Sequence, residues 1–299
     1  MDPRPVIRFA PSPNGYLHLG HAFSALFSFR VAQALGGRFL VRIEDIDEAR
    51  ARPQFVERIF DDLAWLGLTW EEPVLVQSEH MADYRAALDR LDAQGLLYRC
   101  PLTRRQIAEA VTEYEGTGAV WLRDPDGAPL LPPPDGVDLG TTEAVGPFAQ
   151  RLNMTQALGL VSELLTFVEA GPDAAEGPVV ADPTRWGDVV LARKDIGTSY
   201  HLSVVVDDAR QGVTHVTRGA DLYEATHLHR LLQHLLGLPV PAYHHHPLIA
   251  DDDGRKLSKS VLSKSLKALR ADDLTADEAR RLVGIDAYAE YFEALGAAQ

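Results

Sequence analysis

The stretch RFAPSPNGYLHLGH, residues 8–21, constrains the fold of this chain more than any other segment. Apolar residues at 6–9 predict a short buried strand, and the prolines and Asn14-Gly15 that follow predict a rigid loop. An apolar run from Phe23 to Ala34 at helical spacing predicts a helix after the loop. Such a strand, loop and helix form an anion site, because free backbone N–H groups and the helix dipole favour negative charge there.

Two histidines and a glycine lie where that helix should begin, in the pattern His18-Leu-Gly20-His21. Imidazoles at this place suit phosphate oxygens whose charge builds in a transition state. Gly20 suits the close approach of a nucleotide to the backbone. Taken alone, the four letters HxGH more often describe a βα turn with two surface histidines.

A second motif, KLSKS at residues 256–260, follows an acidic stretch and Gly254. Lys256 and Lys259 beside hydroxyl groups suit a loop that closes on a triphosphate and neutralises the leaving pyrophosphate. Loops rich in lysine and serine are usually only solvated, so this motif is weak by itself. Its occurrence after HxGH, in a chain with a parallel α/β pattern, makes the pair specific.

The rest of the chain predicts strands and helices in alternation, which is typical of a parallel sheet with helices on both faces. We expect further strands at 38–43, 203–206 and 214–217, and helices starting at 53, 82 and 220. The expected fold class is therefore α/β, a doubly wound parallel, Rossmann-like nucleotide-binding sheet. An inserted α+β subdomain and a short C-terminal helical segment complete it.

The domain boundaries are expected where this pattern breaks and resumes. Residues 1–98 form the first half of the catalytic domain, and 99–185, rich in proline and glycine, an inserted connective or tRNA-binding subdomain. Residues 186–249 form the second half of the catalytic domain. Residues 250–299 hold the KLSKS loop and the C-terminal helices. Glu44 follows the strand at 38–43, where open α/β sheets place their ligand crevices.

Composition adds a few exclusions. The chain has 299 residues, a formal net charge of −14 and one cysteine, Cys100. One thiol excludes a disulfide framework, and no apolar run is long enough to span a membrane, so we expect a cytoplasmic protein. The acidic balance argues only mildly against a nucleic-acid partner, because a basic patch can lie on an acidic body.

The two motifs resemble the HIGH and KMSKS signatures of class I aminoacyl-tRNA synthetases. The segment RFAPSPNGYLHLGHA, the acidic block at 44–47 and VTRGAD at 216–221 resemble the glutamyl branch in particular. The glutaminyl branch is close, but its loop typically reads PPEPNG, whereas this chain has Ala10-Pro11-Ser12-Pro13. The sequence therefore favours glutamate.

The resemblance implies roles for individual residues. Five of them would bind glutamate: Arg8, Ser12, Glu44, Tyr200 and Arg218. Glu44 would pair with the substrate ammonium, while the choice between Arg8 and Arg218 for the side-chain carboxylate stays open. His18, His21 and Lys259 would be catalytic, and together with Gly20 and Lys256 they would bind ATP. Magnesium is expected with the ATP, as part of the substrate.

Two patterns in the chain could suggest a metal. Cys100 and Tyr114 match half of a zinc site found in some short relatives, but Leu102 and Gly118 occupy the other two positions. Two ligands are too few for a closed zinc site, so we expect no structural zinc and a buried Cys100 thiol. The run 244–246, three histidines, is expected to be a solvated or nucleotide-adjacent turn, since adjacent residues on an extended chain face opposite ways.

Only 39 residues follow Ser260, enough for one or two helices and too few for an anticodon-binding region. An intact catalytic set without that region resembles the glutamyl-queuosine tRNA(Asp) synthetase family. The implied activity is tRNA-independent activation of L-glutamate with ATP. Glutamate is then transferred to the queuosine base at the wobble position of the tRNA(Asp) anticodon stem-loop. A monomer without membrane contact is expected.

Other functions remain open from the sequence. The chain could be a shortened glutamyl-tRNA synthetase that charges the 3′ end of tRNA(Glu), or a non-catalytic tRNA-binding relative. A small-metabolite adenylyltransferase could share HxGH, but would not explain the blocks at 8–12 and 44–47.

Overall fold

The computed structural model describes residues 4–137, 147–175, 177–249 and 264–298. Lys256 and Lys259, both assigned to ATP from the sequence, lie outside the described residues. Among the helices of the described ranges, none combines the length and the apolar character needed to cross a membrane.

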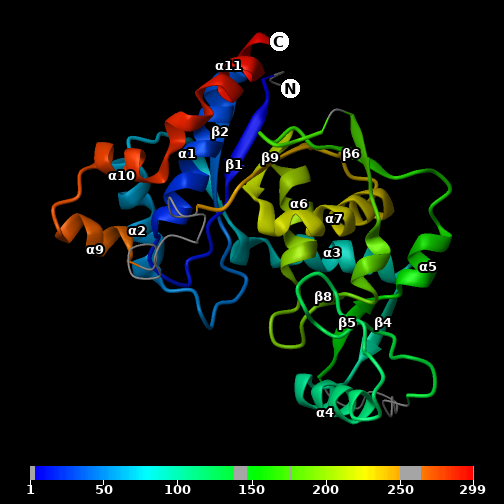
Figure 1. The fold of residues 1–299 in the computed structure, drawn as a ribbon. Coiled ribbons are helices and arrows are strands. Elements are labelled where there is room, and N and C mark those ends of the chain that lie inside the picture. The colour runs from blue at the N-terminus through cyan, green and yellow to red at the C-terminus, as the bar shows by residue number, and fades with distance from the viewer. Residues whose placement is uncertain (1–3, 138–146, 176, 250–263, 299) are drawn as a thin grey trace.

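The centre of the molecule is a five-stranded sheet in which every pairing is parallel (Figure 1). Its order is β10-β9-β1-β2-β3. The strands are β1 (Val6–Phe9), β2 (Arg38–Ile43), β3 (Glu71–Val76), β9 (His215–Gly219) and β10 (Ala242–His246). This order confirms the predicted Rossmann-like sheet, and β3 is a strand that the sequence reading did not include.

Helices cover both faces of this sheet, as a doubly wound fold requires. On β2, Phe39, Val41 and Ile43 belong to one apolar core with α1 and α2, while Arg42 points the other way and bonds Asp208 of α6. The helices that pack near the sheet include α1 (Leu19–Ala34), α2 (Pro53–Trp65), α3 (Met81–Asp92), α6 (Tyr200–Arg210) and α7 (Tyr223–Leu236). A second apolar core joins α3, α6 and α7.

The strand order reverses direction between β1 and β9, which are neighbours in the sheet but far apart in the chain. From β1 the chain winds one way through β2 and β3, and from β9 it winds the other way to β10. Open α/β sheets bind ligands outside the carboxyl ends of the strands at such a switch point. The residues after β1, β2, β9 and β10 are thereby brought together.

Smaller sheets lie between β3 and β9 in the chain. One is antiparallel, with β4 (Leu97–Cys100), β5 (Ala149–Leu152) and β8 (Val190–Ala192) in the order β4-β5-β8. The other pairs β6 (Thr166–Val168) with β7 (Pro178–Val180). With α4 (Arg104–Glu115) and α5 (Met154–Gly159) they supply the expected α+β character, and α4 lies far from the central sheet in Figure 1. Strand β4 begins before residue 99 and β8 lies after residue 185. The predicted bounds of the inserted subdomain, 99–185, therefore stay a prediction.

Three sequence-based expectations differ from the structure. Residues 203–206 are helical within α6 and not a strand. Their run of valines favours a strand by intrinsic preference, but α6 is capped by the Ser199 side chain and packs against α3 and α7, so tertiary packing prevails. Residues 244–246 belong to buried strand β10 and not to a solvated turn, and each of the three histidine rings is bonded inside the protein through at least one nitrogen.

The described C-terminal segment holds three short α-helices, one more than expected. They are α9 (Leu266–Ala271), α10 (Ala276–Val283) and α11 (Ala289–Ala297), and α10 and α11 pack against α1 (Figure 1). Single turns of 3-10 helix complete the fold at Gln77–His80, Pro183–Trp186, Ala220–Leu222 and Ile285–Tyr288.

Candidate active site

A cleft of about 570 Å³ opens at the switch point of the sheet. It is bounded by the chain that follows β1, β2, β9 and β10 and by the first turns of α1 and α6. Every described residue that the sequence assigns to glutamate or ATP lines it: Arg8, Ser12, His18, Gly20, His21, Glu44, Tyr200 and Arg218.

The two histidines of the HxGH motif cap helix α1. His18 is the N-cap, and its Nδ1 accepts the backbone N–H of Gly20 at 3.1 Å. The Nδ1 atom of His21 accepts the backbone N–H of His18 at 3.2 Å. Because both Nδ1 atoms act as acceptors, both rings carry their proton on Nε2 and can donate it to a ligand.

Electrostatics keep these rings neutral. Burial lowers the pKa of His18 below its ordinary value, and burial together with the charge of His18 lowers the pKa of His21 to about 4. A neutral ring with an Nε2–H group is a hydrogen-bond donor without a full charge. The pair therefore supplies two donors at a helix N-terminus, which is the arrangement that a phosphate needs.

Gly20, which was expected to let a nucleotide approach the backbone, also makes room for a side chain of the protein. A Cβ atom at this position would lie 2.9 Å from Cε1 of His18 and 3.1 Å from its Nδ1. The close approach shows that the missing side chain leaves room for the capping imidazole of His18 itself.

Glu44 lies at the carboxyl end of β2 and belongs to a buried charge network. Its Oε1 accepts from Nη2 of Arg42 at 3.0 Å, and Arg42 also donates to Asp208 at 2.7 Å. Asp207 lies 3.9 Å from the same guanidinium. Burial raises the pKa of Glu44 despite the opposing charge of Arg42. A cation bound beside Glu44 would favour its carboxylate form.

Arg8, by contrast, has a carboxylate partner of its own. Its Nε donates to Oδ1 of Asp208 at 2.9 Å and its Nη2 to Oδ2 at 3.3 Å, while Nη1 donates to the carbonyl of Thr217 at 3.0 Å. Burial would raise the pKa of Asp208, but Arg8 and Arg42 hold it below its ordinary value. Asp208 therefore joins the two arginines as a carboxylate.

Arg218, on β9, is surrounded by neutral groups. Its Nε donates to Nε2 of His245 at 3.1 Å, its Nη1 lies 3.2 Å from Nδ1 of His229, and its Nη2 donates to Thr226 at 2.6 Å. The guanidinium also lies over the ring of Tyr243, 5.2 Å from its centroid. Within the described part of the chain, no carboxylate pairs with Arg218. Its positive charge is therefore available to a ligand in the cleft.

The histidines beside Arg218 are held neutral by their surroundings. Burial and the charge of Arg218 lower the pKa of His229 well below its ordinary value. The same two causes lower the pKa of His201, which is 3.1 Å from His229, to about 4. The pKa of His245 is also lowered, chiefly by burial.

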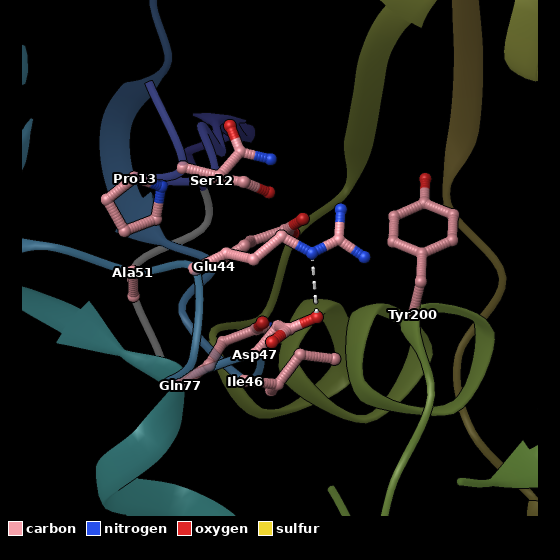
Figure 2. A pocket seen from close by; sticks show the side chains of 10 residues that line it. Ser12, Pro13, Glu44, Ile46, Asp47, Ala51, Gln77 and Tyr200 are labelled. Atoms are coloured by element: carbon pink, nitrogen blue, oxygen red, sulfur yellow. Dashed lines mark ion pairs between the residues drawn. The ribbon is translucent and has the colours of Figure 1, made fainter. Parts of the chain in front are cut away.

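A smaller hollow of about 260 Å³ adjoins the cleft and shares Ser12, Glu44 and Tyr200 with it. Figure 2 shows Ser12 and Pro13 on one side of this hollow and Tyr200 on the other. The dashed line marks the ion pair of Asp47 with Arg50, at 3.2 Å (Figure 2). The hollow and the cleft therefore meet beside Glu44.

The KLSKS motif falls outside the described residues, but the chain on both sides of 250–263 lies at the cleft. Ile249 lines it, and the backbone of Ser265 forms a bridge with His18. Leu266 donates its N–H to the carbonyl of Leu17 at 2.7 Å. The described residues that follow 263 therefore lie beside the HxGH motif.

The residues considered for zinc meet in an apolar cluster. Cys100 on β4 is buried with Trp121, and Leu102 and Tyr114 pack against them. The predicted burial of the Cys100 thiol is confirmed. In the ranges covered by the structure, no group of three or more His, Cys, Asp or Glu side chains could hold a metal ion.

Several residues of the site were not assigned to it from the sequence. They are buried polar side chains that contact the predicted residues or the partners of those residues, namely Arg42, Glu169, Asp208, Thr226, His229 and His245. The signal that could have found them is a charged or polar residue inside an otherwise apolar element, such as Arg42 within the strand RFLVRI.

Residues 5–283 match the family model described as "tRNA synthetases class I (E and Q), catalytic domain". The chain belongs to this family. The expected resemblance to class I aminoacyl-tRNA synthetases is thereby confirmed, as are the nucleotide-binding fold and the ATP-dependent ligase type of enzyme.

Several relatives within the class I tRNA synthetases are similar to the chain over most of its length. It is 48% identical over 293 residues to the glutamyl-Q tRNA(Asp) synthetase of Rhodobacter capsulatus, covering 94% of this chain and 100% of that protein. It is 40% identical to the glutamyl-Q tRNA(Asp) synthetase of Symbiobacterium thermophilum, covering 88% and 80%. Identity to the glutamate–tRNA ligase of Prochlorococcus marinus is 34%, covering 91% and 56%.

Among solved structures, the glutamate-tRNA synthetase of Elizabethkingia anophelis is similar, with a TM-score of 0.69 and 27% identity. The match covers 86% of this chain and 53% of that one, so the chain spans about half the length of that synthetase. A glutamate tRNA ligase from Elizabethkingia meningosepticum in complex with its amino acid gives the same TM-score and identity.

Proposed function

We propose that the protein activates L-glutamate with ATP, without tRNA, and transfers the glutamyl group to the queuosine base of tRNA(Asp). The observation that carries the proposal is the layout of charge in the cleft. Glu44 supplies negative charge at the end of β2, and Arg218 supplies uncompensated positive charge on β9. The N-terminus of α1 and the two imidazole donors line the same cleft.

Glutamate complements this layout. Its ammonium group would pair with Glu44, beside the hydroxyl of Ser12, and the arrival of a cation there would favour the carboxylate form of Glu44. Arg8 is engaged with Asp208, whereas Arg218 has only neutral partners. We therefore assign the substrate's side-chain carboxylate to Arg218, with Tyr200 beside it, and the α-carboxylate to the side of the cleft near Arg8.

Activation joins the α-carboxylate to ATP. A carboxylate oxygen attacks the α-phosphorus, the bond from that phosphorus to the pyrophosphate oxygen breaks, and glutamyl-adenylate and pyrophosphate result. Catalysis of such in-line transfer is mainly positioning and charge stabilisation. The Nε2–H groups of His18 and His21 would donate to phosphate oxygens. Lys256 and Lys259, outside the described residues, would neutralise the leaving pyrophosphate, and Mg²⁺ would arrive with the ATP.

Transfer completes the reaction. A hydroxyl of the queuosine base attacks the carbonyl carbon of the mixed anhydride, the bond to the phosphate oxygen breaks and AMP leaves. The names of the Rhodobacter and Symbiobacterium relatives, glutamyl-Q tRNA(Asp) synthetases, support tRNA(Asp) as the acceptor. The anticodon stem-loop as the part recognised, the monomeric state, the cytoplasmic location and the absence of zinc stay predictions.

The experiment that tests activation is the exchange of labelled pyrophosphate into ATP. We expect glutamate-dependent exchange without any tRNA, with glutamine supporting little. Exchange that requires added tRNA would contradict the proposal. That outcome would favour the second candidate function, a shortened glutamyl-tRNA synthetase that charges tRNA(Glu), for which the similarity to the Prochlorococcus marinus glutamate–tRNA ligase speaks.

A further inference from the structure

A buried glutamate next to the cleft has two different tasks for its two oxygens. Glu169 follows strand β6, and its side chain is 9% exposed. Its Oε1 accepts the backbone N–H groups of Gly171 at 2.9 Å and His245 at 3.0 Å. Its Oε2 contacts Nδ1 of the His245 ring. Glu169 therefore touches both the backbone and the ring of one histidine on β10.

The contact with the ring decides which nitrogen of His245 carries the proton. A carboxylate only accepts, so the hydrogen between Oε2 and Nδ1 belongs to Nδ1. Nε2 then carries a lone pair. It accepts a hydrogen bond from Nε–H of Arg218 at 3.1 Å and lies 3.3 Å from the hydroxyl of Thr226. Burial would raise the pKa of Glu169, but the hydrogen bonds from His245 and Gly171 hold it below its ordinary value.

Like Nε2 of His245, the Thr226 and His229 side chains can accept a hydrogen bond from the Arg218 guanidinium. Thr226 accepts from Nη2, and Nδ1 of His229 faces Nη1. His229 can accept there only when its own proton is on Nε2, which lies 3.1 Å from Nδ1 of His201. Three acceptor atoms thus hold the guanidinium from within the protein. An N–H donor in place of any of these acceptors would repel the N–H groups of Arg218.

We propose that Glu169 is a positioning residue, which holds His245 in the tautomer that orients the guanidinium of Arg218 toward a carboxylate in the cleft. This inference rests on the proposed role of Arg218 in binding the substrate's side-chain carboxylate. It adds a residue that does not line the cleft and acts only through a histidine. A fixed guanidinium loses less conformational freedom when the ligand binds.

The sharpest variant is Glu169→Gln, because the backbone dictates how the new amide must lie. The N–H groups of Gly171 and His245 require an oxygen at the Oε1 position. The –NH₂ group then takes the Oε2 position and donates to Nδ1 of His245, which forces the ring proton onto Nε2. That N–H faces the Nε–H of Arg218. We expect the KM for glutamate to rise on the order of tenfold to a hundredfold, with the KM for ATP unchanged.

A matched control is Glu163→Gln. Glu163 also pairs with a histidine, His234, at 3.6 Å, but its side chain is 65% exposed and far from the cleft lining. This variant loses the same charge and gains the same amide. We expect its KM for glutamate to equal that of the unmodified protein. An equal rise in both variants would overturn the proposal.

A second background separates positioning from a merely structural role. His245→Gln has no tautomers, and its amide oxygen can accept from Arg218. In that background, Glu169→Gln should change the KM for glutamate less than twofold. If Glu169 acts through its bonds to the backbone instead of the His245 ring, the rise would persist in this background, which contradicts the proposal.

The tautomer itself can be observed by ¹⁵N NMR of the histidine rings, a readout that needs no substrate. We expect Nδ1–H at His245 in the unmodified protein and Nε2–H in Glu169→Gln. An unchanged tautomer would overturn the proposal even if activity falls. Conversely, a changed tautomer with a normal KM for glutamate in Arg218→Gln would leave the link from Glu169 to His245 intact and reject the proposed role of Arg218.

Discussion

Arg8 and Arg218 are two buried arginines of one cleft, and their surroundings differ in charge. Arg8 on β1 shares the carboxylate of Asp208 with Arg42. Arg218 on β9 is held by two histidines and a threonine, all neutral. Both residues are almost fully buried, at 4% and 5% exposed. The comparison teaches that burial alone does not make an arginine a ligand-binding group; the charge of its fixed partners decides.

The difference has an energetic reason. A buried guanidinium with a carboxylate partner is largely compensated, so an added anion gains little from it. A buried guanidinium with neutral partners keeps its charge, and a carboxylate ligand completes the pair that the protein leaves open. On this ground we assign Arg8 to the folded framework, and we propose Arg218 as the group that distinguishes glutamate from glutamine.

The largest expected effect is on activation by Arg218→Gln. Without the guanidinium the side-chain carboxylate of glutamate would be buried without a cation, so kcat/KM for glutamate should fall by about a thousandfold or more. The KM for ATP should change little. Pyrophosphate exchange measures both, and Arg185→Gln, which removes an arginine from an exposed pair with Glu224, is the control. Unchanged glutamate kinetics in Arg218→Gln would remove the distinction between the two arginines.

The next effect is a loss of folding stability, and it concerns the ion pair of Arg8. Asp208→Asn leaves Arg8 and Arg42 facing a neutral amide, and breaking a buried ion pair costs about 3–5 kcal/mol. Urea unfolding should show this loss. In Asp83→Asn, which disrupts an exposed pair with Arg210, the loss should stay below about 1 kcal/mol. Similar losses in both variants would mean that Arg8 is not part of a buried framework.

The third effect is the response of stability to acid, which should reach the Arg218 side first. His201 has a pKa of about 4 in the folded protein, and that of His229 is lower than ordinary too, so the unfolded chain binds protons between about pH 6.5 and 4 that the folded chain does not. Stability should therefore fall as the pH is lowered through this window, by about 1.4 kcal/mol per pH unit for each such histidine.

Asp208 should respond only at lower pH. The pKa of Asp208 is depressed, so its contribution to stability is complete above the ordinary aspartate pKa of about 3.9 and is lost only as the pH falls below that value.

The histidine effect can be measured by urea unfolding at pH 7, 6 and 5. The free energy of unfolding should fall less steeply with decreasing pH in His201→Gln than in the unmodified protein. Identical slopes would show that the histidines around Arg218 are not kept neutral by the fold.

Much of the fold and of the cleft lining could be predicted from the sequence. The strand at 38–43 and the HxGH loop follow local patterns, and motif resemblance placed Glu44 and Arg218, far apart in the chain, in one site. Local patterns failed at 203–206, where packing between α3 and α7 overrides the preference of valine for strands. They also could not reveal the partners of Arg218, since Glu169 and His245 meet only through folding.

The most direct test of the central claim is the transfer of labelled glutamate from glutamate and ATP to purified tRNA. Three acceptors should be compared: tRNA(Asp) with queuosine at the wobble position, tRNA(Asp) without it, and tRNA(Glu). The account predicts label on queuosine-containing tRNA(Asp) only, recovered in the anticodon stem-loop after nuclease digestion. Label on the 3′ end of tRNA(Glu), or on tRNA(Asp) without queuosine, would contradict it.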